Sequence, residues 1–268
     1  MSLIDPTLTK PIHPVFPLRK EDRLAPTDPD PAAVQPNEPA GTRAVIAALQ
    51  LIPHPEGGYF VETDRDQRRV ANPFHASYDS GMTTLGAKHV FSEVTDDSAA
   101  GREHGEEGEQ KGDAKGALWT ALTRSASTNI FYLLTQGRGW GRFHRNKGRT
   151  VHTLHKGRAR YVIIHADEVY KGIRAKGDAR IETYVVGQDV VAGEKLQWIV
   201  DGGKYKASFL LADEEGGQES REGCLISETV IPGFEYTDHD FLKPEELVEL
   251  IGAERAAELD WLLTKCEE

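Results

Sequence analysis

Short runs of alternating apolar and polar residues, separated by glycine-marked turns, dominate the middle of the chain. The clearest stretch covers residues 129–164, where β-branched and aromatic runs are divided by the turns QGRG, NKG and KGRA. This pattern predicts antiparallel strands joined by tight turns. The same reading applied to the whole chain predicts strands at residues 59–65, 82–91, 118–122, 130–135, 140–145, 149–155, 160–164, 180–186, 196–200, 205–211 and 224–231.

Helical periodicity appears only on either side of the predicted strands. Thr42 is the expected N-cap of a short helix that ends before Pro53. Near the end of the chain, Pro244 and the glutamates after it suit a first helical turn, and leucines then recur at helical spacing. We expect residues 246–268 to form a helical segment that packs against the strands.

Two segments carry no periodic apolar pattern. Residues 1–42 hold nine of the 14 prolines, and proline lacks the backbone donor that helices and sheets need. Residues 93–116 contain eight acidic residues and five glycines, a composition typical of disordered loops. We therefore expect a disordered extension over residues 1–42, a single β domain over residues 43–245, and a disordered acidic insertion within it at residues 93–116.

Composition and charge narrow the function classes. The net charge of −11 argues against a nucleic-acid-binding surface, which needs a basic patch. No apolar run is long enough to cross a membrane, and the first residues have no apolar core of a secretory signal. Two distant cysteines, Cys224 and Cys266, do not form a disulfide framework. We expect a cytoplasmic protein with no nucleic-acid or membrane partner.

Polar residues line one face of the central strands. Residues two apart in a strand share a face, so Arg142 and His144 face one way, and Thr150 and His152 share a face in the next run. A polar face enclosed by apolar strands in a small barrel is a candidate ligand pocket. The alternative is that these side chains face solvent on an ordinary sheet.

The spacing in this region resembles a known family. His144, Thr150 and Gly157 follow one another with the cadence of the first sequence motif of the cupin superfamily. Three later residues fall roughly where the second cupin motif would lie: Gly187, Gly193 and Gln197.

Two longer phrases sharpen the resemblance. LIPHPEGGYFVETDR at residues 51–65 and IPGFEYTDHDF at residues 231–241 are similar to the opening and closing phrases of a largely uncharacterised single-domain cupin branch. The resemblance covers roughly residues 43–245. It implies an all-β fold, the double-stranded β-helix or jelly-roll barrel, with a site in the barrel mouth and often a homodimer.

The chain departs from the metal ligand set that the resemblance implies. Metal-binding cupins use two histidines and a glutamate from the first motif and one histidine from the second, and here only His144 stands in place. Asn146 and Thr150 replace the second histidine and the glutamate, and Gln197 or the residue before it replaces the last histidine. Threonine is a poor ligand for transition metals. We predict no metal and no cofactor, and a weak site at His144 and His152 stays open.

A histidine can also act without a metal. His144, with a reference pKa of about 6.5, is the expected general base. We expect His152 and Tyr132 to complete the catalytic group, since neighbouring imidazoles lower each other's pKa and a tyrosine offers a hydroxyl. The dTDP-sugar epimerases share the cupin barrel and work without metal through a histidine base and a tyrosine acid. This chain resembles that mode.

The expected substrate-binding residues come from the same face and from the phrase HPEGG. An arginine can clamp a carboxylate or phosphate with two hydrogen bonds. The two glycines of HPEGG let the backbone approach a ligand closely, and in the resembling branch the strand after them lies beside the barrel mouth. The expected set is Arg142, Glu56, Tyr59, Glu62, Thr150 and Gln197.

Three functions remain in view. The favoured one is a metal-independent isomerase, epimerase or lyase that acts on a small carbonyl compound, because an imidazole can remove a proton next to a carbonyl. The alternative is a non-catalytic module that binds a small polar or anionic molecule. A metal-dependent dioxygenase or decarboxylase is less favoured, because the usual ligands are missing.

Overall fold

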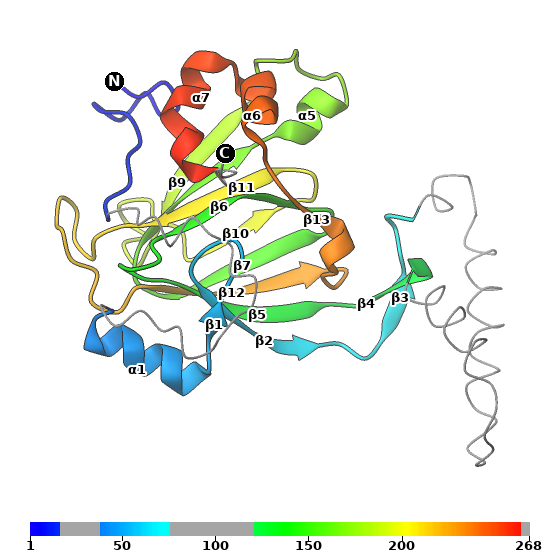
Figure 1. Ribbon diagram of the computed structural model, residues 1–268, viewed down its shortest axis with the longest axis horizontal. Coiled ribbons are helices and arrows are strands. Elements are labelled where there is room, and N and C mark those ends of the chain that lie inside the picture. The colour runs from blue at the N-terminus through cyan, green and yellow to red at the C-terminus, as the bar shows by residue number, and fades with distance from the viewer. Residues whose placement is uncertain (17–37, 76–120, 264–268) are drawn as a thin grey trace, which may run out of the picture.

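The computed structural model describes residues 1–16, 38–75 and 121–263, and the elements in these ranges are shown in Figure 1. They are α1 (Ala40–Leu49), β1 (Ile52–Pro53), β2 (Tyr59–Arg65), β3 (Arg69–Ala71), β4 (Thr123–Ser125), β5 (Thr128–Leu134), β6 (Trp140–Asn146), β7 (Arg149–Lys156), β8 (Ala159–Ile164), α5 (Ala166–Tyr170), β9 (Ile181–Val186), β10 (Gln197–Val200), β11 (Tyr205–Leu210), β12 (Cys224–Ile231), η2 (Tyr236–Asp238), β13 (His239–Phe241), α6 (Pro244–Ile251), α7 (Ala253–Leu259) and η3 (Asp260–Leu262).

Two antiparallel sheets face each other. One has six strands in the order β1-β2-β5-β12-β7-β10, and the other has five in the order β13-β6-β11-β8-β9. A separate two-stranded antiparallel sheet, β3-β4, extends from one side. The all-β fold is confirmed, and so are the strands expected from β2 to β12 within the described residues. The expected strand at 82–91 and the acidic insertion at 93–116 lie outside them, as does most of 118–122.

Burial of the side chains alternates with a period of two residues along the strands that line the barrel. In β7 and β12 every second side chain is buried, because one face points into the barrel. All six residues of β11 are buried, since its outer face is also covered. The barrel interior holds an apolar cluster whose members are Phe16, Tyr132, Leu134, Leu154, Ala159, Tyr161, Ile163, Val186, Trp198, Val200, Leu210, Cys224 and Ile226.

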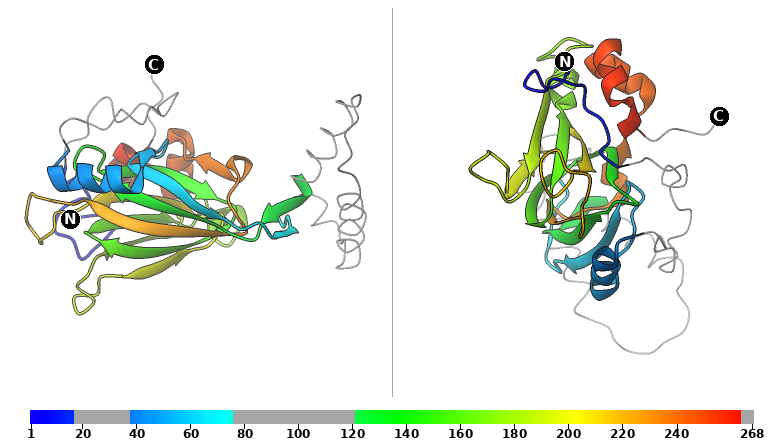
Figure 2. Two further views of the ribbon diagram at one scale, coloured as in Figure 1. Left: turned by 90° about the horizontal axis from the view of Figure 1, so that it is seen from below. Right: turned by 90° about the vertical axis from the view of Figure 1, so that its left-hand side faces the viewer.

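Helices cover the outer faces of both sheets. The C-terminal helices α6 and α7 pack on the five-stranded sheet, where Leu247 and Leu259 join Phe143 and Phe209 in a second core. On the other side α1 covers the six-stranded sheet through Ile46. Figure 2 shows these layers from two further directions. Within the described ranges, no helix combines the length and apolar character needed to cross a membrane.

The N-terminal residues correct one expectation. Residues 1–16, which we call the N-terminal strap, lie against the C-terminal helices with Ile4 and Ile12 buried in the second core. The Glu258 carboxylate accepts hydrogen bonds from the backbone N–H groups of Leu3 and Ile12, at 2.8 and 2.7 Å. The expectation of disorder over residues 1–42 is therefore wrong for the strap, because its isoleucines supply the burial that its prolines do not. Residues 17–37 lie outside the described ranges.

Candidate functional site

His144 projects from β6 into the barrel. Its Nδ1 lies 2.7 Å from the carbonyl oxygen of Arg142, two residues earlier in the same strand. A carbonyl oxygen only accepts hydrogen bonds, so Nδ1 of His144 carries the proton. Nε2 of the neutral ring is unprotonated and points into the barrel. Burial lowers the pKa of His144 to about 3, against the raising effect of the nearby Glu56 carboxylate.

Glu56 belongs to the HPEGG turn between β1 and β2. The turn requires both of its glycines: Gly57 and Gly58 have positive φ, and an added Cβ would lie 2.0 Å from the Trp140 carbonyl oxygen and 2.6 Å from that of Leu133. The Glu56 carbonyl accepts a hydrogen bond of 2.8 Å from the backbone N–H of Arg142. This contact fastens the turn to β6 at Arg142, the same residue whose carbonyl oxygen holds the His144 ring.

His239 begins β13, the edge strand beside β6. It pairs in register with Asn146, while Phe241 pairs with His144. The strand β13 therefore lies beside the part of β6 that carries His144. The residue before it, Asp238, is buried and receives two hydrogen bonds from Arg124, at 2.7 and 3.1 Å. This ion pair holds the η2 turn that delivers His239.

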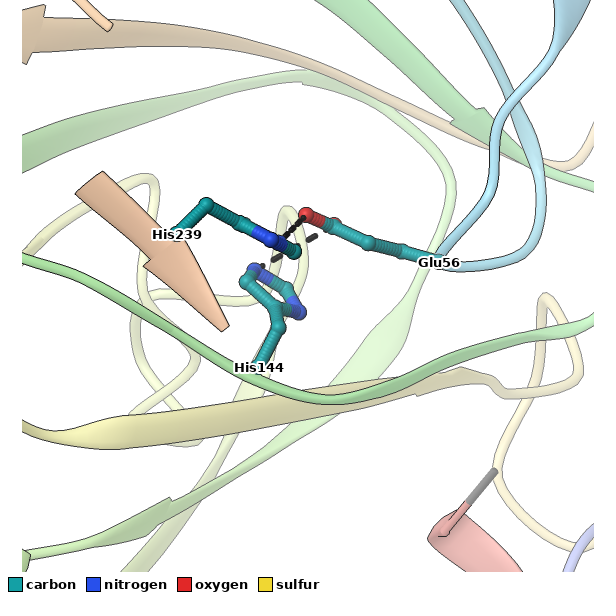
Figure 3. Close-up of side chains that lie close together, drawn as sticks. All are labelled: Glu56, His144 and His239. Carbon is teal, nitrogen blue, oxygen red and sulfur yellow. Dashed lines mark hydrogen bonds and ion pairs between the residues drawn. The ribbon is translucent and has the colours of Figure 1, made fainter. Parts of the chain in front are cut away.

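The three side chains converge on one point, as Figure 3 shows. His239 Nε2 lies 2.8 Å from Glu56 Oε1, and His144 Nε2 lies 3.2 Å from Glu56 Oε2. The two imidazole rings stack, with their centroids 5.4 Å apart. His54 adds a third imidazole at the edge, where its Nδ1 accepts the Glu56 N–H at 3.1 Å. Burial alone would raise the pKa of Glu56, but His144, His54 and His239 together lower it.

The donor set fits a divalent metal ion. One ligand atom from each of Glu56, His144 and His239 lies within 4.8 Å of the others. Two imidazoles and a carboxylate suit zinc, iron or manganese. His144 already has the second interaction that orients many metal-binding histidines, a hydrogen bond from its other ring nitrogen to a carbonyl. The prediction of no metal rested on Asn146 and Thr150 and did not consider this different set of residues.

A second polar group lies across the interior. His152, on the opposite sheet, is fully buried, with its Nε2 2.9 Å from Lys206 Nζ. Lys206 also donates to Glu228 Oε2 at 2.6 Å. The His152 ring stacks on Trp198 at 5.0 Å. His152 thus faces the interior as expected, but Lys206 lies next to it where a direct pairing with His144 was expected.

Two other expected residues also reach the interior. Thr150 is buried and shares the inner face of β7 with His152. Tyr132 is buried on the inner face of β5, with its hydroxyl so close over Gly141 that an added Cβ there would lie 2.7 Å from the oxygen. Burial raises the pKa of Tyr132 well above its ordinary value, so the hydroxyl stays protonated.

Two expected ligand-binding residues lie outside the barrel interior. Gln197 is exposed because β10 begins with it in the outward phase, so that Trp198 and Val200 point inward. Tyr59 is buried, but under α1 against Ile46 on the outer face of the sheet. In both cases the prediction was wrong because the residue lies in the phase of its strand that faces away from the barrel interior.

Glu62 and Arg142 also depart from the expectation. Glu62 is exposed and its carboxylate forms an ion pair of 2.8 Å with Arg65. In β6 the register shifts opposite Lys206 and Ser208, so the two-residue count fails between Gly141 and His144. The Arg142 guanidinium lies 5.3 Å from the centre of the Trp140 ring, and Trp140 belongs to the second core outside the barrel. The bulge therefore separates Arg142 from His144.

Sequence reasoning missed His239, Lys206, Glu228 and His54. Two of these had a local signal: Lys206 and Glu228 are the lone charges, at buried positions, of the strands YKASFL and CLISETVI. His239 stands between two aspartates in a short phrase, TDHD, with no strand pattern around it. Its place beside Glu56, 183 residues away, comes only from the tertiary fold.

A barrel of two facing antiparallel sheets, with histidines and carboxylates on its inner face, is the architecture of cupins. The chain belongs to the cupin superfamily family DUF985, whose model matches residues 43–242. Uncharacterized protein YML079W from Saccharomyces cerevisiae is 36% identical over 228 residues, which cover 85% of this chain and 88% of that protein. The expected family and jelly-roll fold are confirmed.

Solved structures agree on the fold. A hypothetical protein from Leishmania major is 24% identical with a TM-score of 0.57, and the match covers 83% of this chain and 98% of that one. Protein SO0799 from Shewanella oneidensis is 19% identical with a TM-score of 0.51, and the match covers 86% and 99%. None of these three names states an activity.

Proposed function

We propose that the protein is a metal-dependent cupin that binds and converts a small oxygen-bearing molecule, with Glu56, His144 and His239 as metal ligands. The hydrogen-bond balance at His144 carries this proposal. Because Nδ1 donates to the Arg142 carbonyl, Nε2 of the neutral ring carries a lone pair and no hydrogen, and it faces the Glu56 carboxylate 3.2 Å away. Two acceptors at this distance repel each other unless a cation is shared between them.

The three side chains are not fully buried. The side chains of Glu56 and His239 are 12% and 11% exposed, whereas that of His144 is 7% exposed and faces the interior. A bound divalent metal would polarise a carbonyl, carboxylate or hydroxyl oxygen of a ligand. Glu56 would balance part of the metal charge, and Arg142 would keep His144 in the correct tautomer through its backbone carbonyl. Three protein ligands leave positions free for such a molecule.

The test begins with the metal itself. The purified full-length protein, treated with a chelator and titrated with Zn²⁺, Co²⁺, Mn²⁺ and Fe²⁺, is expected to bind one ion per chain. His144→Ala and His239→Ala should abolish that binding. His155→Ala is the matched control, because His155 is exposed on the outside of β7. Equal binding by wild type, His144→Ala and His239→Ala, or no stoichiometric binding of any of the four ions, would refute the proposal.

A metal-independent isomerase or epimerase is the second candidate function. The observation that favours it is Tyr132, whose buried hydroxyl has no hydrogen-bond partner among the described residues and remains protonated. A neutral His144 could remove a proton beside a carbonyl while Tyr132 donates one to the oxygen. No metal is needed for this exchange.

One experiment separates the two candidates. The chelator-treated protein is incubated in deuterated water with small keto acids and keto sugars, and deuterium uptake is followed by NMR. Uptake that survives chelation and disappears in Tyr132→Phe favours the second candidate. Uptake that returns only when metal is restored favours the first. Ligand bound and recovered without any exchange would favour the non-catalytic binding module.

The expected assembly and location stay predictions. A homodimer would appear as twice the chain mass of 29.6 kDa in analytical ultracentrifugation. A cytoplasmic location would be tested by fractionation of the native cells.

A further inference from the structure

Lys206 joins the two sheets through the middle of the barrel. It comes from β11 of the five-stranded sheet, and both of its partners, Glu228 on β12 and His152 on β7, belong to the six-stranded sheet. Its side chain is only 4% exposed. Removing an ammonium from water is costly, and a buried ion pair is often no more stabilising than apolar residues of similar size. Stability alone therefore does not account for a lysine here.

Lys206 also lies next to the candidate metal ligands. In the register of β11 and β6, Lys206 is paired directly with His144, and both side chains face the interior. Side chains paired in this way across antiparallel strands have Cβ atoms about 5 Å apart. The ammonium has three donors, and two are used by Glu228 and His152. The third donor is left for the space between the two polar groups.

Tyr132 offers another donor to the same space. Its hydroxyl is buried without a hydrogen-bond partner among the described residues. It lies over Gly141, where an added Cβ would be 2.7 Å from the oxygen, and Gly141 pairs with Ser208 next to the pair of His144 and Lys206. An ammonium hydrogen and a phenol hydrogen, both unused, call for an acceptor such as an oxyanion.

The summed charge of the barrel interior favours a ligand that carries a single negative charge. Glu56 and Glu228 contribute two negative charges and Lys206 one positive charge, so −2 + 1 gives −1. A divalent cation at Glu56 changes this sum to +1. A carboxylate carries one negative charge at neutral pH, whereas a phosphate monoester carries about −1.5 to −2. The charge balance therefore fits a carboxylate.

We propose that Lys206, held by Glu228, and the hydroxyl of Tyr132 bind the carboxylate of the substrate, which is a small monocarboxylic acid whose other oxygen reaches the Glu56–His144–His239 centre. This inference rests on the proposed function for the second half of the contact. It makes Lys206 the residue that selects the substrate class. Its partner Glu228 holds the ammonium in place inside the barrel through a hydrogen bond of 2.6 Å.

The probes are glycolate and its neutral analogue glycolamide, with inorganic phosphate as a third ligand. Binding to the full-length protein is measured by titration calorimetry, with and without added Zn²⁺, and the metal content of every sample is determined. Wild type is expected to bind glycolate at least about tenfold more tightly than glycolamide or phosphate, a difference of about 1.4 kcal/mol. Equal affinity for glycolate and glycolamide overturns the proposal, and a preference for phosphate replaces the carboxylate with a phosphate group.

The decisive variant is Lys206→Met/Glu228→Gln, which removes both charges together and leaves no buried charge unpaired. We expect it to keep its metal and to lose at least about tenfold in glycolate affinity. The control is Lys204→Met/Asp167→Asn, which removes an ion pair of 3.1 Å outside the barrel and should bind glycolate like wild type. Unchanged glycolate affinity in the first variant sinks the inference. Absence of metal from wild type sinks the proposed function instead, and the Lys206 contribution is then read from the metal-free titrations.

Discussion

Glu56 and Glu228 are two carboxylates on the inside of one barrel, and the side chains that contact them differ. Glu228 has an ammonium, that of Lys206, at 2.6 Å, with His152 beside it at 3.4 Å. Glu56 has imidazoles, His239 at 2.8 Å and His144 at 3.2 Å. A buried carboxylate needs a positive charge. The chain supplies it permanently to Glu228 through Lys206, whereas at Glu56 the proposed function assigns this role to an exchangeable metal ion.

The supports of the two carboxylates differ as well. Glu228 lies within β12, paired on one side with β5 and on the other with β7. Glu56 lies in a turn, and His239 opens an edge strand of three residues. The permanent pair is thus built into the centre of a sheet, and the exchangeable centre is assembled from three separate pieces of chain.

Breaking the permanent pair should have the largest effect. Lys206→Met leaves Glu228 buried without its ammonium, which we expect to lower the free energy of unfolding by about 3–5 kcal/mol. Glu56→Gln, in metal-free protein, should change it by less than about 1 kcal/mol, because no permanent partner is lost. Urea unfolding of both variants measures the difference. Restoration of stability by adding Glu228→Gln to Lys206→Met is the control, and equal losses at the two sites would contradict the comparison.

The second-largest expected effect is that of a metal ion binding at Glu56, His144 and His239. A metal ion at about 100 times its dissociation constant should raise the free energy of unfolding by about 2.7 kcal/mol, because it binds only the folded protein. Glu56→Gln should abolish this gain, and Lys206→Met/Glu228→Gln should retain it. Thermal unfolding with and without Zn²⁺ tests all three proteins. A gain of the same size in Glu56→Gln would show that the ion binds elsewhere.

The third prediction concerns the loss of stability in acid that is caused by His152, the histidine beside Glu228. Burial, together with Lys206, lowers the pKa of His152 below its ordinary 6.5, so the folded protein keeps the ring neutral while the unfolded chain takes up a proton. This part of the stability is fully present above pH 6.5 and is lost as the pH falls from 6.5 toward the folded value. Between pH 6.5 and about 5, the free energy of unfolding of His152→Gln should therefore fall by up to about 2 kcal/mol less than that of wild type.

The measurement is urea unfolding of metal-free protein at a series of pH values. His155→Gln, a substitution at an exposed position of the same strand, should follow wild type. Parallel curves for wild type and His152→Gln would mean that His152 takes up its proton equally in both states.

The smallest expected effect comes from the support of His239. Arg124→Met/Asp238→Asn removes the buried ion pair that holds the η2 turn, and interactions that orient a metal ligand typically contribute tenfold or more to metal affinity. We expect the metal dissociation constant to rise about tenfold, with the ion still bound. Lys147→Met is the control, since Lys147 lies 3.6 Å from the same carboxylate but is half exposed. Titration with Zn²⁺ should leave that control unchanged.

The strands were predictable because their signal is local. In β12 every second residue is buried, and such alternation is visible in CLISETVI itself. The N-terminal strap was not predictable in this way, since Ile4 and Ile12 are separated by prolines and gain burial only from the distant C-terminal helices.

The site was predicted only in part. His144 and Glu56 were found from motif cadence and the HPEGG phrase, and each lies in the observed centre. The two-residue count failed for Arg142 because a bulge in β6 shifts the phase. The one local signal of that bulge is Gly141 in WGRFHRN, since an isolated glycine inside a strand often marks a bulge. His239 could not be found from local pattern, because what gives it a role is the return of β13 to the side of β6.

The N-terminal strap has a consequence for the newly made chain. Residues 3 and 12 bond to Glu258, which is translated 255 and 246 residues later. At about 5–20 residues per second, the ribosome needs on the order of 10 to 50 seconds to cover that distance. Throughout this interval Ile4 and Ile12 have no helix to pack on and are open to any chaperone that binds nascent apolar segments. The strap thus reaches its final place only after Glu258 has been made.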